Sequence, residues 1–104
     1  MRFGPWYSLD DAAAEAPGAE NVLQLRLADG ELRSYPRGKS AMVHYAHAPD
    51  ARAAAVALAG SLGVSGLRCR HLIEIDAGVD LAAFHAKLVA DFTRRFGTRP
   101  SIDR

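Results

Sequence analysis

The segment from Leu81 to Phe96 constrains the fold of this chain more than any other part of the sequence. Its apolar side chains and one histidine recur at helical spacing and form one continuous stripe: Leu81, Phe84, His85, Leu88, Val89 and Phe92. Asp80 can cap the first turn of this helix, and Gly97 can end its last turn. Because a helix of this kind is stabilised mainly by packing, we expect it to lie across one face of a sheet.

Alternating apolar residues in the first half of the chain predict that sheet. Residues 22–27 place leucines at every second position, so these leucines share one face. Asp29-Gly30 is a strong signal for a two-residue hairpin turn, and residues 32–35 are therefore expected to return antiparallel to 22–27. Residues 36–40 are expected to form a loop or a bulge before the next strand, which spans 42–46.

The same alternation assigns faces in the later strands. Within 42–46, Val43 and Tyr45 are expected on one face of the sheet, because side chains alternate along a strand. Met42 and His44 are expected on the opposite face. The last predicted strand covers 67–75, and one of its faces would carry Leu67, Cys69, His71, Ile73 and Ile75.

Two further helices complete the pattern. Ser8 can cap a short helix that stops before Pro17-Gly18, and Pro49 or Asp50 can open an alanine-rich helix that ends near residues 60–63. The order is then helix, three strands, helix, strand, helix. We predict a single domain over residues 1–104 of the α/β (α+β) class, with a small, mostly antiparallel sheet of three to four strands flanked by helices.

Charge gives only local hints about partners. The formal net charge of +1 does not by itself indicate nucleic-acid binding, because such binding uses many phosphate contacts. Basic residues are nevertheless close in sequence in two places, and a solvated surface is the simpler interpretation of both. The first cluster is Arg33, Arg37 and Lys39, and the second is Arg94, Arg95 and Arg99.

The expected compartment is the cytoplasm. Cys69 is the single cysteine, so an intrachain disulfide is excluded. The N-terminus lacks the basic and apolar regions of a signal peptide, and no stretch approaches the ~20 apolar residues of a membrane helix. We therefore expect no membrane partner.

Three segments, taken in order, carry a family resemblance: residues 21–27, 43–52 and 84–103. The second segment is similar to the pattern apolar, Tyr, Ile, Gly, small, X, X, Leu, Arg. Tyr45 and Arg52 match it, whereas Ala46, His47 and Ala51 stand for isoleucine, glycine and leucine.

The third segment is similar to a pattern that begins apolar, Glu, X, X, Leu-Leu and ends Gly, X, X, Pro, X, X, Asn. Its matching residues are Leu88, Val89, Phe92, Gly97 and Pro100. His85 replaces the glutamate and Asp103 replaces the asparagine. Together the segments resemble the core of GIY-YIG nucleases over roughly residues 18–103, as a degenerate member of that superfamily.

The resemblance implies both a fold and a chemistry. The strand with Leu23 and the strand with Tyr45 should be neighbours, followed by a helix with an arginine, a strand, and a helix with a glutamate. In the family a tyrosine helps deprotonate water, the arginine steadies phosphate charge, and the glutamate holds a divalent cation. Here Leu23 stands at the tyrosine position, and His85 offers nitrogen, which is a poor partner for Mg²⁺.

The residues that the resemblance assigns to a remnant catalytic site are Tyr45, Arg52 and His85. We expect His85 beside Tyr45 and Arg52, with a hydrogen-bond partner at the edge of the sheet. Each residue also has a structural interpretation, which we favour: a boundary aromatic for Tyr45, a surface arginine paired with a carboxylate for Arg52, and a boundary histidine for His85. Candidate nucleic-acid-binding residues are Arg37, Lys39 and Arg52.

Two other site types fit the sequence poorly. The cysteine and the four histidines match no standard zinc spacing; they are His44, His47, Cys69, His71 and His85. Gly38-Lys39-Ser40 is similar to the end of a phosphate loop, but Arg33 stands where that motif needs glycine, and a strand follows instead of a helix.

We therefore expect a degenerate GIY-YIG-like domain without hydrolytic activity and without a metal or other cofactor, retained to bind nucleic acid or a protein. One alternative is an active endonuclease with a relocated site for a divalent cation such as Mg²⁺. Another is a small self-associating domain of unknown role. Neither the oligomeric state nor the role of the four histidines follows from the sequence.

Overall fold

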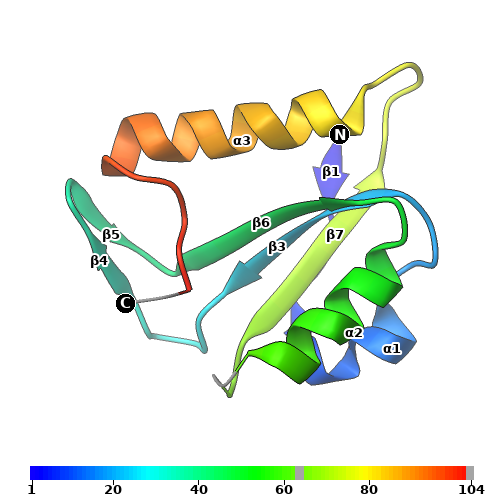
Figure 1. Ribbon diagram of the computed structural model, residues 1–104, viewed down its shortest axis with the longest axis horizontal. Coiled ribbons are helices and arrows are strands. Elements are labelled where there is room, and N and C mark those ends of the chain that lie inside the picture. The colour runs from blue at the N-terminus through cyan, green and yellow to red at the C-terminus, as the bar shows by residue number, and fades with distance from the viewer. Residues whose placement is uncertain (63–64, 103–104) are drawn as a thin grey trace.

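The computed structural model describes residues 1–62 and 65–102, and it confirms the predicted class of a small α+β fold (Figure 1). Asp103, one of the positions compared with the family, lies outside the described residues. In chain order the elements are β1 (Arg2–Phe3), β2 (Tyr7–Ser8), the 3-10 helix η1 (Leu9–Asp11), α1 (Ala12–Glu15), β3 (Asn21–Arg26), β4 (Arg33–Tyr35), β5 (Gly38–Ser40), β6 (Met42–Ala48), α2 (Ala51–Ser61), β7 (Arg68–Glu74) and α3 (Leu81–Phe96).

The main sheet is antiparallel throughout the described residues. Its central strand is β3, which pairs with β6 on one side and with β7 on the other. The short strands β1 and β2 both pair with the outer side of β7. Leu23 is opposite Ala46, and Gln24 is opposite Tyr45, so the predicted neighbourhood of these two strands is confirmed.

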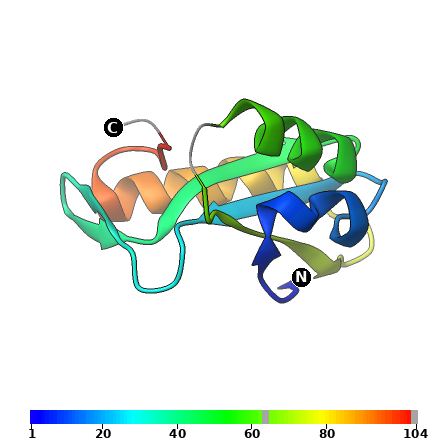
Figure 2. The ribbon, with the colours of Figure 1, turned by 90° about the horizontal axis from the view of Figure 1, so that it is seen from below.

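Helices cover the two faces of this sheet separately, as Figures 1 and 2 show. On one side, called the α2 face, α1 and α2 enclose a core that includes Leu23, Leu25 and Cys69. On the other side, called the α3 face, α3 packs over a smaller core centred on Val22 and Leu72. Helices therefore lie on both faces of the sheet.

Side-chain caps fix the ends of the two longer helices. The Asp50 carboxylate accepts a hydrogen bond from the Ala53 amide at 3.1 Å, and Asp80 accepts one from Ala83 at 3.1 Å. The C-terminus of α3 ends at Gly97, whose φ of 87° is in the left-handed region and whose amide donates to the Thr93 carbonyl at 2.8 Å. These predicted helix limits are confirmed.

The predicted hairpin around Asp29-Gly30 is wrong. A turn does form there, because the Glu31 amide donates to the Ala28 carbonyl at 3.0 Å. Gly30 has a φ of 83°, but no residue other than glycine has a positive φ among the described residues, so the two-residue turn that returns a strand directly is absent. Strand β4 pairs with β5 instead, and β5 occupies part of the segment predicted as a loop.

The predicted faces of β6 are also partly wrong. The pairing of β3 with β6 shifts register between Leu25 and Arg26, and such an irregularity rotates the side chains that follow it. Val43 therefore joins the core on the α2 face, whereas Tyr45 packs against Phe92 of α3. No helix in the described part of the chain combines the length and the apolar character needed to cross a membrane.

Candidate functional site

His85 reaches from α3 to the edge of the sheet. Its Nε2 atom lies 3.1 Å from the carbonyl oxygen of Tyr45, on β6, which is the outermost strand on that side. Because a carbonyl oxygen only accepts, Nε2 must carry the proton in this hydrogen bond. The predicted hydrogen bond of His85 at the sheet edge is confirmed.

The Tyr45 side chain lies between the sheet and α3. Its ring meets Phe92 edge-on, with centroids 5.8 Å apart and planes at 86°. Burial raises the pKa of the Tyr45 phenol, and the positive charge of Arg70 offsets this only in part. At neutral pH the phenol is therefore protonated and is a poor acceptor of a proton from water.

Arg52 is on the opposite side of the sheet from His85. It belongs to α2, and its Nε donates to the Ala16 carbonyl at 2.9 Å. Its backbone amide donates to the Pro17 carbonyl at 2.9 Å. These partners are carbonyl groups rather than the carboxylate that the structural interpretation expected.

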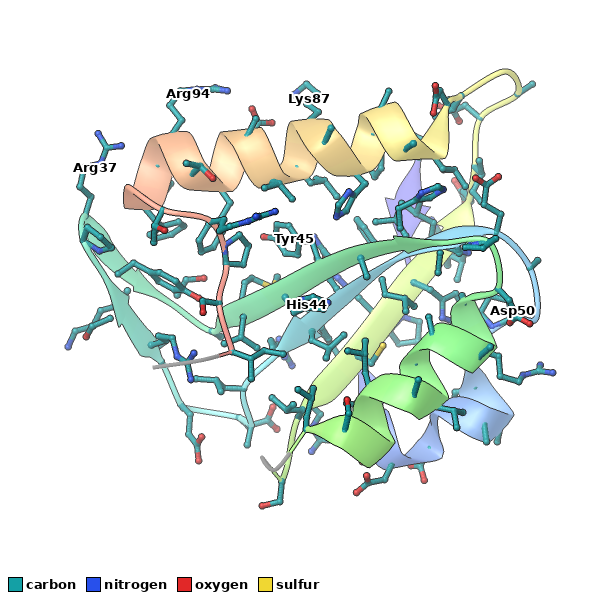
Figure 3. All side chains as sticks on the ribbon, viewed as in Figure 1. Arg37, His44, Tyr45, Asp50, Lys87 and Arg94 are labelled. Atoms are coloured by element: carbon teal, nitrogen blue, oxygen red, sulfur yellow. The ribbon has the colours of Figure 1, made fainter. Side chains whose placement is uncertain are left out.

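The structure thus brings His85 to Tyr45 and places Arg52 with α1. It also separates Arg52 from Arg37 and Lys39, the other expected nucleic-acid-binding residues. Asp50, which caps the helix that carries Arg52, lies at the opposite end of the long axis from Arg37 (Figure 3).

The remaining positions of the family pattern have separate structural partners. Leu23 is fully buried within the core on the α2 face. His47 forms an ion pair or hydrogen bond with Glu20 at 2.7 Å.

The Tyr7 hydroxyl and the Nδ1 atom of His71 are 2.9 Å apart. Cys69 is buried beside this pair, and burial raises the pKa of its thiol. Within residues 1–62 and 65–102, no group of three or more His, Cys, Asp or Glu side chains could hold a metal ion. A hollow of about 270 Å³ is lined by Arg26, residues 27–32 and Ala41.

The two basic clusters of the sequence meet at one end of the molecule. The Arg37 amide donates to the Phe96 carbonyl at 3.0 Å, and the Arg37 guanidinium lies 3.5 Å from the Thr93 carbonyl oxygen. These contacts join the β4–β5 turn to the C-terminal end of α3, where Arg37 and Arg94 lie at the same end in Figure 3. We call this surface the basic end, and its exposed side chains are Arg37, Lys39, Arg94 and Arg95.

An aromatic cluster supports the basic end from beneath. Phe92 is 5% exposed, and its ring centre lies 5.0 Å from that of Tyr35 and 4.5 Å from that of Phe96. The Tyr35 hydroxyl donates to the Met42 carbonyl at 2.6 Å, which ties β4 to the start of β6. The guanidinium carbon of Arg95 is 5.4 Å from the centre of the Phe96 ring. The basic side chains therefore extend from a packed base.

Among the described residues, a carboxylate pairs with one side chain of this surface, Arg94. Asp91 contacts Arg94 at 2.7 Å and Lys87 at 2.8 Å, and the hydrogen bond from Lys87 holds the pKa of Asp91 below its usual range. Lys87 itself is on the outer side of α3 (Figure 3). The partial negative charge at the helix C-terminus favours cations such as Arg94 and Arg95 without consuming their hydrogen-bond donors.

Comparison with family models, with curated proteins and with solved structures found no match of any of the three kinds.

Proposed function

We propose that this chain is a GIY-YIG-like domain that has lost hydrolysis and binds nucleic acid through the basic end. The observation that carries the proposal is that Arg37 and Lys39 of the first cluster meet Arg94 and Arg95 of the second on one exposed surface. A polyanion binds to such a surface because each phosphate that meets an arginine or lysine releases condensed counterions. The aromatic base beneath it limits how much order these side chains must gain on binding.

The order of the elements supports the family assignment. Strand β3, with Leu23, is paired with β6, with Tyr45, and α3 crosses the outer face of that pair. An arginine-bearing helix, a strand and a final long helix follow in the expected order.

The contacts of the remnant residues support the loss of hydrolysis. Leu23 is fully buried and has no group that could accept a proton. His85 already donates to the Tyr45 carbonyl, and Arg52 is engaged with Ala16 on the opposite face. A phosphodiester could not reach all of these side chains at once without large rearrangement, and proximity of this kind contributes heavily to catalysis.

Binding can be tested by fluorescence anisotropy with labelled single-stranded and duplex oligonucleotides, over about 50 to 200 mM salt. We expect affinity to fall with salt, and each lost phosphate contact should reduce the logarithmic salt slope by about 0.9. The informative variant combines Arg37→Gln with Lys39→Gln, since both side chains are exposed.

The matched control combines Arg2→Gln with Lys87→Gln, which removes the same charge from side chains paired with Glu74 and Asp91. Equal binding by the two double variants would show that net charge, and not the basic end, attracts the polyanion. Absence of any salt-dependent binding by the unmodified chain would refute the proposal.

Loss of hydrolysis has its own test, which is cleavage of labelled single-stranded, duplex and branched DNA with Mg²⁺ or Mn²⁺. We expect no turnover above background. Turnover that disappears in Arg52→Ala would contradict this expectation and support the active endonuclease instead.

A further inference from the structure

Three arginines share the α3 face of the strand pair β3–β7. Arg26 and Arg68 are directly opposite each other in the register of these strands, so their side chains leave the sheet on the same face. Arg70 is two residues beyond Arg68 and points to that face as well. Helix α3 packs mainly on β6, the strand on the other side of β3. This cluster is separate from the basic end and was not predicted from the sequence.

Trp6 holds two of these guanidinium groups. Its ring centre is 4.3 Å from the guanidinium carbon of Arg26 and 4.4 Å from that of Arg70. Trp6 reaches this position because residues 4–6 separate β1 from β2 along the outer side of β7. We call Trp6, Arg26, Arg68 and Arg70 the arginine–tryptophan patch. Its cation–π contacts stabilise the positive charges only in part.

One arginine of the patch has a hydrogen-bond donor without an acceptor. Among the described residues, the Nε atom of Arg26 is buried and has no hydrogen-bond partner. The ion pair of this side chain is with Asp29, at a long 3.5 Å. Arg70 donates from Nε to the amide oxygen of buried Gln24 at 2.7 Å, so a neutral group is its acceptor there.

The electrostatics of the patch are unfavourable as they stand. Like charges opposite each other on a sheet repel, and a buried donor without an acceptor costs free energy. Burial, followed by the neighbouring charge of Arg26, lowers the pKa of the Arg70 guanidinium. An anion bound between these arginines would offset the repulsion between their like charges.

We propose that Arg26, Arg68 and Arg70 bind a phosphate group beside Trp6. A phosphate monoester matches three guanidiniums better than a carboxylate does, because it offers three terminal oxygens and close to two negative charges. Guanidinium groups also suit the geometry of phosphate oxygens. This site does not depend on the proposed function, since it uses none of the residues of the basic end.

Trp6 is the single tryptophan, so its fluorescence reports on the patch directly. Titration with inorganic phosphate should change the emission along a saturable curve, whereas NaCl or acetate at equal ionic strength should not. Arg70→Gln should raise the dissociation constant for phosphate at least about tenfold, which is the effect of losing one charged hydrogen bond.

Arg68→Gln serves as a second variant in case Arg70→Gln alters folding, because Arg70 also donates to the buried Gln24 side chain. Arg2→Gln is the control, as it removes one positive charge from an exposed pair with Glu74 on the far edge of β7. Circular dichroism of each variant establishes that the sheet is intact. The proposal is overturned if NaCl reproduces the emission change, or if both patch variants titrate like the control.

Two further arms identify the source of the phosphate. Tighter binding of a nucleoside monophosphate than of inorganic phosphate supports the site and indicates a small nucleotide ligand. Tighter binding of a single-stranded oligonucleotide, measured in the Arg37→Gln/Lys39→Gln variant, would overturn the monoester assignment, because a backbone diester offers only two terminal oxygens and one negative charge. If neither ligand competes with inorganic phosphate, phosphate held there is not part of an ester and the ester assignment is overturned.

Discussion

His85 provides the sharpest test of how α3 is attached to the sheet. The His85 side chain is half-buried, and its Nε2 donates to the Tyr45 carbonyl at 3.1 Å on the edge strand β6. His85→Leu keeps the apolar stripe of the helix but removes this donor. We expect the free energy of unfolding to fall by about 1 kcal/mol, the net contribution of one such hydrogen bond. For a domain of this size, that loss lowers Tm by about 4–8 °C.

Two companion substitutions separate the hydrogen bond from the shape of the side chain. His85→Gln retains an N–H donor at similar length, so its stability should lie closer to that of the unmodified chain. His85→Glu places a carboxylate against a carbonyl oxygen, which leaves two acceptors facing each other and should cost about 1–3 kcal/mol. Urea denaturation of the three variants gives these differences directly.

Mg²⁺ then tests whether the family's metal position survives in this geometry. A carboxylate at residue 85 and the Tyr45 carbonyl are both oxygen ligands, which Mg²⁺ prefers. With about 10 mM Mg²⁺ and a dissociation constant of about 1 mM, His85→Glu should regain about 1.4 kcal/mol. Calorimetry checks the binding itself, and catalysis should stay near background because Leu23 remains. If His85→Gln is as unstable as His85→Leu, the reasoning about the hydrogen bond is wrong. If Mg²⁺ does not stabilise His85→Glu, the geometry of the family's metal position has been lost.

Three other outcomes are expected. Phe92→Ala should lower the free energy of unfolding by about 3–5 kcal/mol and also weaken nucleic-acid binding, because this 5% exposed ring supports the basic end. Thermal melting measures the first effect and fluorescence anisotropy the second, with Val56→Ala at an exposed position as the control. Gly97→Ala should lower the free energy of unfolding by about 1 kcal/mol or more, because the φ of Gly97 is 87° and an added Cβ would lie 3.1 Å from the Pro36 side chain. An unchanged melting temperature would contradict the role of the left-handed cap. Burial lowers the pKa of His44 and of His71 below 6.5, so the unfolded chain binds more protons than the native chain at mildly acidic pH. The stability contributed by these histidines should therefore be complete above pH 6.5 and fall as the pH decreases below it. Urea midpoints at about pH 7 and pH 5 test this, and the double variant His44→Gln/His71→Gln should show a weaker pH dependence.

Features with a strong local cause could be predicted from the sequence. Asp50, Asp80 and Gly97 set helix limits through groups adjacent in the chain, and the structure has caps at each. The apolar stripe of α3 likewise fixed which side of that helix meets the sheet, with Leu81 and Phe92 buried. In these cases neighbours within one turn determine the outcome, so no knowledge of the tertiary fold is needed.

Features that depend on distant partners were missed. Strands β1 and β2 have two residues each and are stabilised by pairing with β7, whose residues are 60 to 72 positions away, so no local periodicity marks them. The hairpin prediction failed because the strand after Asp29-Gly30 pairs with β5 rather than β3. The basic end requires the contact of Arg37 with Phe96, which alternation along either segment could not reveal.

The short strands along β7 have a consequence for how the molecule avoids sticking to copies of itself. A sheet edge with free amides and carbonyls is a template for another chain. The N-terminal residues 2–8 occupy much of the outer edge of β7, and His85 blocks one carbonyl on the opposite edge, at β6. Shortening the chain from its N-terminus would therefore uncover the β7 edge next to Ile73 and Ile75, which are already 47% and 44% exposed. Met1, Phe3 and Tyr7 also pack against the two cores, so the first eight residues would affect both the solubility and the stability of this domain.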